Sequence, residues 1–232
     1  MLEPRKNELF FSIVKEHIAT CAPVGSKAIV EHTRFDLSPA TIRNEMADLE
    51  QKGLIEQPHT SAGRIPTEKG WKYYIENLMQ ETLPDKRERE QIQKAIAGST
   101  EGFNHSLKAV ARTLADMSKN AAFVGFSRDD VYYTGLSNLF SNPEFAELDM
   151  IRSISEIVDH LDDVMYGLFA DLPVGRKILI GGENPFGKEC GVVIEKIKHN
   201  GKESVMGVLG PIRMAYDKTS GIMTCTKELL IS

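Results

Sequence analysis

The chain has 232 residues and a formal net charge of −5, so it is long enough for one large or two small domains with hydrophobic cores. No apolar run reaches the roughly 18 residues of a membrane span, and the first residues, MLEPRKNELFF, carry charges where a signal peptide would be apolar. Cys21, Cys190 and Cys225 lie far apart, which excludes a metal-type spacing and an even set of disulfides. We expect a cytoplasmic protein that makes no contact with a membrane.

The first third of the chain predicts three helices. Apolar residues at helical spacing indicate a helix over residues 3–20, and a shorter helix follows over 26–33. The third begins at Ser38 and Pro39, a serine N-cap followed by proline at the first helical position. It ends at Gly53, a residue that readily adopts the left-handed conformation beyond a helix terminus.

A β-hairpin is expected next. Short strands over 54–56 and 65–66 enclose a polar loop, and another helix begins at Thr67 and continues to about residue 78. Two helices joined by a short turn and followed by a hairpin are typical of a winged helix-turn-helix. We therefore predict such a domain over residues 1–82.

The third helix carries candidate base-reading side chains. Ile42, Met46 and Leu49 form its buried stripe, and polar residues fall on the opposite side. Arginine can read guanine and asparagine can read adenine in the major groove, and a helix start offers backbone N–H groups to a phosphate. The candidates on this helix are Ser38, Thr41, Arg43 and Asn44. The alternative is that Arg43 merely pairs with a neighbouring acid.

The hairpin loop, within QPHTSAGRIPTEKGWKYY, carries groups that suit DNA phosphates or a minor groove. Those we single out are His59, Thr60, Ser61, Arg64 and, on the following helix, Lys69. The alternative is an ordinary solvated hairpin. Residues 1–80 contain 10 Lys and Arg against 11 Asp and Glu, a balance that predicts modest non-specific affinity for DNA.

The remainder predicts a helical linker over 83–119 and a second α+β domain over 120–232. The linker is polar and helix-prone, whereas the last segment alternates strand patterns such as KILIGG and CGVVIEKIK with helical patterns over 147–169 and 219–230. No serine, cysteine or acid stands in a pattern that supports a nucleophile with its base. We expect neither an enzyme, nor a cofactor, nor a metal site.

Three segments of the chain resemble the sequences of one protein family. The first and longest is LSPATIRNEMADLEQKGLIEQPHTSAGRIPTEKGWKYYIENLM, residues 37–79. GLSNLFSNPEF at 135–145 is similar to part of the family's regulatory domain. IGGENPFGKECGVVIEKIK with GVLGPIRMAYDK, within 180–218, is similar to its C-terminal region and includes the GPxRMxY signature. Together the three segments, from the beginning, the middle and the end of the chain, resemble the heat-inducible transcription repressor HrcA family of bacteria.

The resemblance implies a winged helix-turn-helix joined to a GAF-like domain. It implies a homodimer that binds double-stranded operator DNA at an inverted repeat and represses chaperone genes, with a GroEL-type chaperonin promoting the active form. It places Arg43 and Asn44 in the recognition helix and His59, Ser61 and Arg64 in the wing. A ligand-sensing winged-helix regulator and a protein-interaction adaptor are the alternatives.

One departure from the family concerns dimerisation. The family carries several GAF strands and an inserted dimerisation domain before GLSNLF, whereas here only the residues from about Lys119 to Thr134 fill that place. The resemblance therefore implies a reduced GAF-like domain that pairs differently. Candidate pairing surfaces are the helices over 86–119 and over 148–170. The first is favoured because Leu107, Val110 and Leu114 could form a helix–helix seam.

Overall fold

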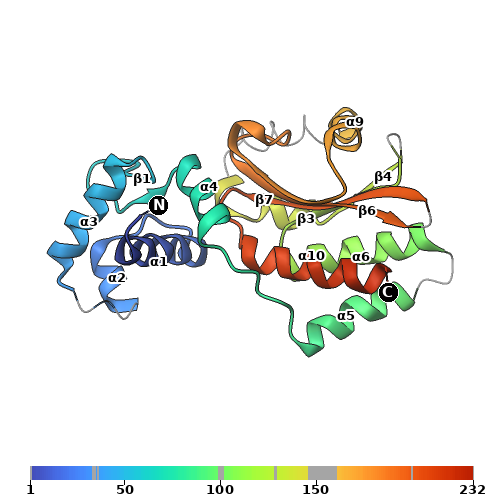
Figure 1. Ribbon diagram of the computed structural model, residues 1–232, viewed down its shortest axis with the longest axis horizontal. Helices are drawn as coiled ribbons and strands as arrows, with labels where there is room; N and C mark the ends of the chain where they lie inside the picture. Colours follow the sequence, from blue (N-terminus) through green and yellow to red (C-terminus); the bar gives the residue numbers. More distant parts are fainter. Residues whose placement is uncertain are drawn as a thin grey trace. The chain divides into compact units, whose positions relative to one another are not determined.

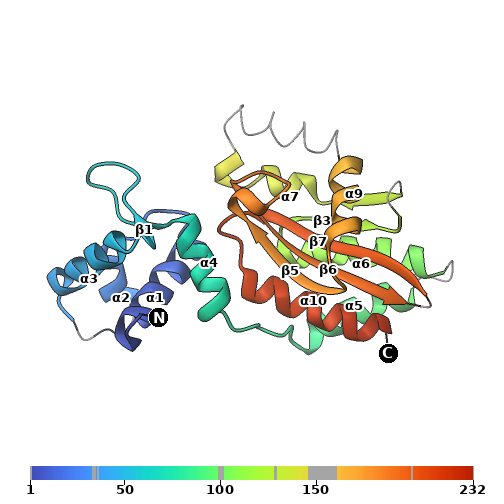
Figure 2. The same ribbon diagram turned by 45° about the horizontal axis from the view of Figure 1, so that its top comes forward.

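The computed structural model describes residues 2–32, 35, 37–98, 102–127, 130–145, 161–199 and 201–231. The chain divides into two compact units, Met1–Gln80 and Glu81–Ser232. Both are drawn in Figures 1 and 2. No helix in the described ranges is both long and apolar enough to cross a bilayer.

The first unit contains the helices and the hairpin expected from the sequence. Its elements are α1 (Pro4–Thr20), α2 (Ser26–His32), α3 (Pro39–Gln51), β1 (Ile55–Glu56), β2 (Ile65–Pro66) and α4 (Glu68–Asn77).

Local signals explain where the helices of this unit begin and end. The Ser38 side chain accepts a hydrogen bond from the Thr41 backbone N–H and so caps α3, and Thr67 caps α4 in the same way. Gly53 follows α3 with a φ of 70°, a left-handed conformation that glycine adopts without steric cost. The capping and the stop predicted from the sequence are confirmed.

The core of the first unit joins all of its helices. Phe10 of α1, Ile29 of α2, Leu49 of α3 and Trp71 of α4 are each at most 1% exposed. Ile42, Met46 and Leu49 are all buried, so the predicted apolar stripe of α3 is confirmed. This burial fixes which side of α3 faces outward.

In its described residues, the second unit is a five-stranded antiparallel sheet with helices on both faces. Its strands are β3 (Ala121–Gly125), β4 (Val131–Thr134), β5 (Gly175–Ile180), β6 (Cys190–His199) and β7 (Lys202–Pro211), in the spatial order β4-β3-β7-β6-β5. Its helices are α5 (Lys86–Ala97), α6 (Phe103–Ser118), α7 (Leu136–Phe140), α9 (Leu161–Asp171) and α10 (Tyr216–Ile231), with 3-10 turns η1 (Pro143–Phe145) and η2 (Gly181–Glu183). The fold class is mixed helix and sheet. The N-terminal part of the helix expected over 147–169 falls outside the described residues.

The two faces of the sheet carry different layers. Figure 1 shows α9 on one face, and α6 and α10 on the other with α5 beyond them. Phe123, Met165 and Ile194 belong to the apolar core under α9, which Phe145 and Phe186 complete. The rings of Phe123 and Phe186 lie 5.5 Å apart, so aromatic side chains fill this space.

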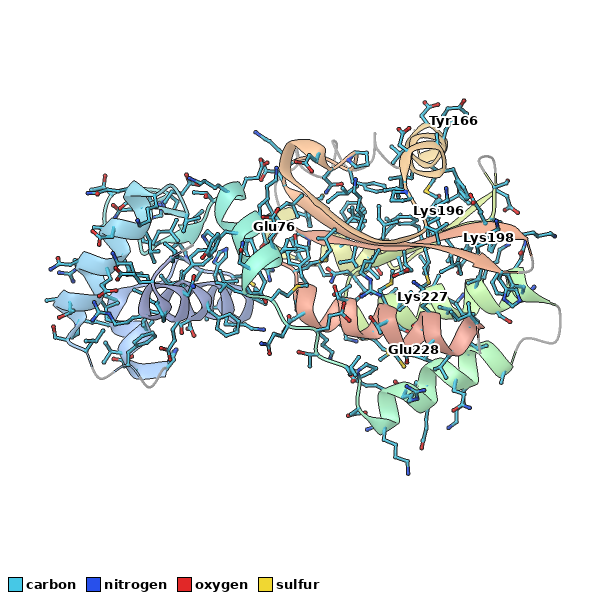
Figure 3. All side chains as sticks on the ribbon, in the orientation of Figure 1. Glu76, Tyr166, Lys196, Lys198, Lys227 and Glu228 are labelled. Carbon is cyan, nitrogen blue, oxygen red and sulfur yellow. The ribbon has the colours of Figure 1, made fainter. Side chains whose placement is uncertain are left out.

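Adjacent charged residues of β6 bind these two layers to the sheet. Figure 3 labels one of them, Lys196, together with Lys227 of α10. Lys196 donates hydrogen bonds to the carbonyls of Phe169 and Leu172, at 2.9 and 3.1 Å, at the end of α9. Glu195, which is 1% exposed, lies on the opposite face from Lys196. Its carboxylate accepts hydrogen bonds from Lys227 of α10 and from Arg176 of β5. Because side chains alternate along a strand, neighbouring residues reach opposite layers.

The segment over 83–119, expected as a helical linker, forms α5 and α6 and lies within the second unit. α6 contacts β3, β4 and β7, and α5 contacts α6 and α10. Leu107, Val110 and Leu114 are each at most 1% exposed within this unit. The expected dimer seam through these side chains is therefore wrong, because they pack inside their own unit.

The signature segments at 135–145 and 210–216 are joined by Arg213. Its guanidinium binds the Glu144 carboxylate through Nε and Nη2 and donates from Nη2 to the Asn142 side chain at 3.2 Å. The GPxRMxY signature therefore has a structural role in this chain.

Candidate nucleic-acid interface

The outward side of α3 presents the polar residues expected from the sequence. Arg43 and Asn44 are exposed, while Ile42 and Met46 beside them in the chain are buried. Within the described part of the chain, the Arg43 side chain forms no ion pair or hydrogen bond. The alternative, that Arg43 pairs with a neighbouring acid, therefore gains no support from the described residues.

Each of the three acidic residues of α3 is bound by a cation from another element. Arg5 of α1 binds Glu45, Lys6 of α1 binds Asp48 at 2.7 Å, and Arg64 beside β2 binds Glu50 at 3.0 Å. The hydrogen bond from Lys6 holds the pKa of Asp48 below its usual value. These ion pairs compensate the negative charges of α3. The positive charge of Arg43 is not compensated by an ion pair within the described residues.

The hairpin is attached to the segment that precedes α2. Val24 and Arg64 pair as an isolated antiparallel bridge, with both backbone hydrogen bonds at 2.9 Å. A Cβ at Gly63 would lie 2.4 Å from the Val24 carbonyl carbon and 2.6 Å from that of Pro23. Only glycine allows the backbones to approach this closely, so the hairpin is fixed beside the start of α2.

A cleft of about 440 Å³ lies where these elements meet. It brings together three of the expected site residues, Arg43, Ser61 and Arg64. Arg64 also holds Glu50 through Nε and Nη2, and its Nη1 forms no hydrogen bond within the described residues. The cleft therefore joins α3 to the hairpin in a single surface.

Other expected site residues lie elsewhere in this unit. The Ser38 hydroxyl is 3.0 Å from that of Thr41, and both belong to the cap at the start of α3. His59 and Thr60 are exposed in the loop between β1 and β2. Lys69 donates to the Lys52 carbonyl at 2.7 Å and so binds the C-terminal end of α3.

Sequence reasoning missed two residues that line the cleft. Lys27, at the start of α2, and Gln57, after β1, stand on the same cleft as Arg43. The Gln57 amide donates to the Ala62 carbonyl at 2.9 Å and closes the loop. Lys27 is far from the hairpin in sequence, and the Val24–Arg64 pairing holds the start of α2 beside the hairpin.

These features place a cleft lined by cationic side chains between a helix and a hairpin of the smaller unit. Residues 68–219 match the family model described as the HrcA protein C terminal domain. Since this match covers more than half of the chain, the chain belongs to the HrcA family.

The curated relatives carry the same family name. The heat-inducible transcription repressor HrcA of Moorella thermoacetica is 25% identical over 334 positions, covering 99% of this chain and 97% of that protein. Its namesake from Pelotomaculum thermopropionicum is 42% identical over 123 positions, which cover 53% of this chain and 35% of that protein. A crystal structure of a hypothetical protein shares the fold with a TM-score of 0.73 at 18% identity, covering 99% of this chain and 98% of that one.

The chain is shorter than these relatives. The alignment with the HrcA repressor of Carboxydothermus hydrogenoformans runs over 322 positions and covers 94% of both proteins. This chain has only 232 residues, so at least 90 of those positions have no counterpart in it. A shorter chain is what we expected from the few residues, about Lys119 to Thr134, that precede GLSNLF.

Proposed function

We propose that this protein is a sequence-specific DNA-binding transcription repressor of heat-shock genes, acting in the cytoplasm. The observation that carries the proposal is the outer side of α3. Arg43 and Asn44 are exposed there, and Arg43 has no partner within the described residues. The acids of the same helix are each bound to a cation from elsewhere in the unit. Side chains that remain available on a rigid helix are what direct reading of bases requires.

On this proposal the first unit is a winged helix-turn-helix. α3 is the recognition helix, and the hairpin between β1 and β2 is the wing. The expected contacts are Ser38 and Thr41 with phosphate at the helix start, Arg43 and Asn44 with bases, and His59, Thr60, Ser61, Arg64 and Lys69 with the flanking backbone. The second unit is the reduced GAF-like regulatory domain.

The proposed active form is a dimer on an inverted repeat. One recognition helix reads only a few base pairs, whereas two helices related by two-fold symmetry read both halves of a palindrome. Heating would lower the folded or dimeric fraction and thereby release the operator. The family resemblance adds a GroEL-type chaperonin as a partner that favours the active form.

The test is the affinity of Arg43→Ala for an operator duplex selected from a random pool. If Arg43 contacts a base, we expect a loss of about 1–3 kcal/mol and weaker discrimination at one position of each half-site. Lys188→Ala is the matched control, because it removes one charge from an exposed side chain of the second unit. Unchanged affinity of Arg43→Ala would overturn the role of this residue. A wild-type protein that shifts no duplex would overturn the repressor proposal itself.

A further inference from the structure

We propose that the cleft in the first unit seats one phosphodiester of the bound DNA strand and that Lys27 neutralises it. This inference rests on the proposed function and adds a residue and a defined contact to it. The cleft is lined by the start of α2, by α3 and by the hairpin, so its ligand would touch all three elements.

The charge of the cleft favours an anion. Its lining within the described chain includes the cations Lys27, Arg43 and Arg64 and no carboxylate. Glu50 compensates Arg64, whereas Lys27 and Arg43 form no ion pair within the described residues. In a chain of net charge −5 this is a local concentration of positive charge, and local charge governs binding of a polyanion.

The other lining groups suit a sugar–phosphate strand. Ser61 lines the cleft and is exposed, and its hydroxyl, which donates to the Thr60 carbonyl, can rotate to donate to a phosphate oxygen. A volume of about 440 Å³ exceeds that of a single phosphate group and accommodates the adjoining sugars.

The walls of the cleft are fixed before any ligand arrives. The backbone pair Val24–Arg64, the close approach at Gly63 and the Gln57–Ala62 hydrogen bond hold the hairpin against the start of α2. A preformed site loses little conformational entropy on binding. Lys27 is itself exposed, so its removal should leave the fold intact.

The experiment combines Lys27→Ala with single neutral linkages in the DNA. The full chain is titrated with the selected operator duplex and with versions that carry one methylphosphonate per half-site, scanned along each strand. If Lys27 pairs with one phosphate, a methylphosphonate at that phosphate should lower the affinity of the wild type about tenfold. The same methylphosphonate should leave the affinity of Lys27→Ala unchanged, because the pairing side chain is already missing. Lys27→Ala should also weaken operator and unrelated duplexes by the same factor and lower the salt slope by about one. Lys188→Ala controls for net charge, and thermal unfolding checks the fold.

The outcomes separate this inference from the proposed function. If every methylphosphonate lowers the DNA affinity of the wild type and of Lys27→Ala by the same factor, the assignment of Lys27 is overturned. This holds even if Arg43→Ala still loses affinity for the operator. Wild-type affinity and salt slope in Lys27→Ala would overturn it as well. Competition for the cleft by inorganic phosphate at micromolar concentration would show a free anion as its ligand, and would overturn the DNA-strand assignment. Absence of any DNA binding by the wild type would instead overturn the proposed function.

Discussion

Ion pairing decides which charged side chains of the first unit remain available. The counts of acidic and basic residues are nearly equal, and from the sequence this balance predicts modest attraction for DNA. In the fold, Arg5 and Lys6 are committed to Glu45 and Asp48, and Arg43 on the same helix is left without such a partner in the described chain. Pairing between α1 and α3 depends on tertiary contacts, so composition could not reveal it.

Cys190 makes the second unit sensitive to alkaline pH. Burial raises the pKa of its thiol to about 12 from an ordinary value of 9.0, with a smaller contribution from Glu189. The native thiol therefore keeps its proton where the unfolded thiol has lost it. This contribution to stability is complete below pH 9 and is lost as the pH rises toward 12. The expected loss from this group is about 1.4 kcal/mol per pH unit in that window.

Cys190→Ala should make the decline in unfolding free energy between about pH 9 and pH 11 shallower than in the wild type. Urea unfolding followed by circular dichroism measures this slope. Burial also raises the pKa of Tyr216 well above its usual value, so some decline remains in the variant above pH 10. Cys21→Ala, on an exposed side chain, is the control. Equal slopes in the Cys190→Ala variant and the wild type would contradict this account of the thiol.

Local sequence signals predicted the elements of the first unit because capping and periodicity act over a few residues. Ser38, Thr67 and Gly53 mark helix ends in the sequence and do so in the structure. The roles of Arg64 and Lys69 were harder to foresee. Each binds a group of α3 that is distant in sequence, the Glu50 carboxylate and the Lys52 carbonyl.

One buried carboxylate helps to hold α10 to the sheet of the second unit. Glu195 is 1% exposed and is held by Arg176, at 2.9–3.0 Å, and by Lys227, at 2.7 Å. Arg176 also binds the Glu81 carboxylate and the Ser220 carbonyl, so it joins the start of this unit to α10. A Cβ at Gly221 would lie 2.0 Å from the Thr82 carbonyl oxygen, which shows how closely this segment packs on α10.

Arg176→Ala should destabilise the second unit by about 3 kcal/mol, because it leaves Glu195 buried with only part of its compensation. Hydrogen exchange read by mass spectrometry should show faster exchange in β5, β6 and α10. Arg89→Ala is the matched control, since its ion pair with Glu228 at 3.8 Å is between side chains that are 51% and 60% exposed and its other contact, 3.7 Å to the Cys225 Sγ, is to a weak acceptor. Exchange as slow as in the wild type would show that Glu195 does not require Arg176.

Helical periodicity shows that a helix has an apolar face but does not identify what covers that face. Leu107, Val110 and Leu114 have the spacing of a dimer seam, and in the structure they are buried within their own unit, where α6 contacts strands of the sheet as well as α5 and α10. The pairing of two chains thus remains a proposal drawn from the symmetry of operators. At least 90 positions of the alignment with a full-length relative have no counterpart in this chain.

Selection of duplexes from a random pool by the full chain tests the repressor account most directly. If α3 enters a major groove in each half of a two-fold complex, the enriched duplexes share an inverted repeat with its half-sites about one helical turn apart, or a multiple of that spacing. Light scattering of the complex should then give the mass of two chains on one duplex. A pool that remains random after repeated rounds, or an enriched sequence without two-fold symmetry that binds a single chain, would contradict it.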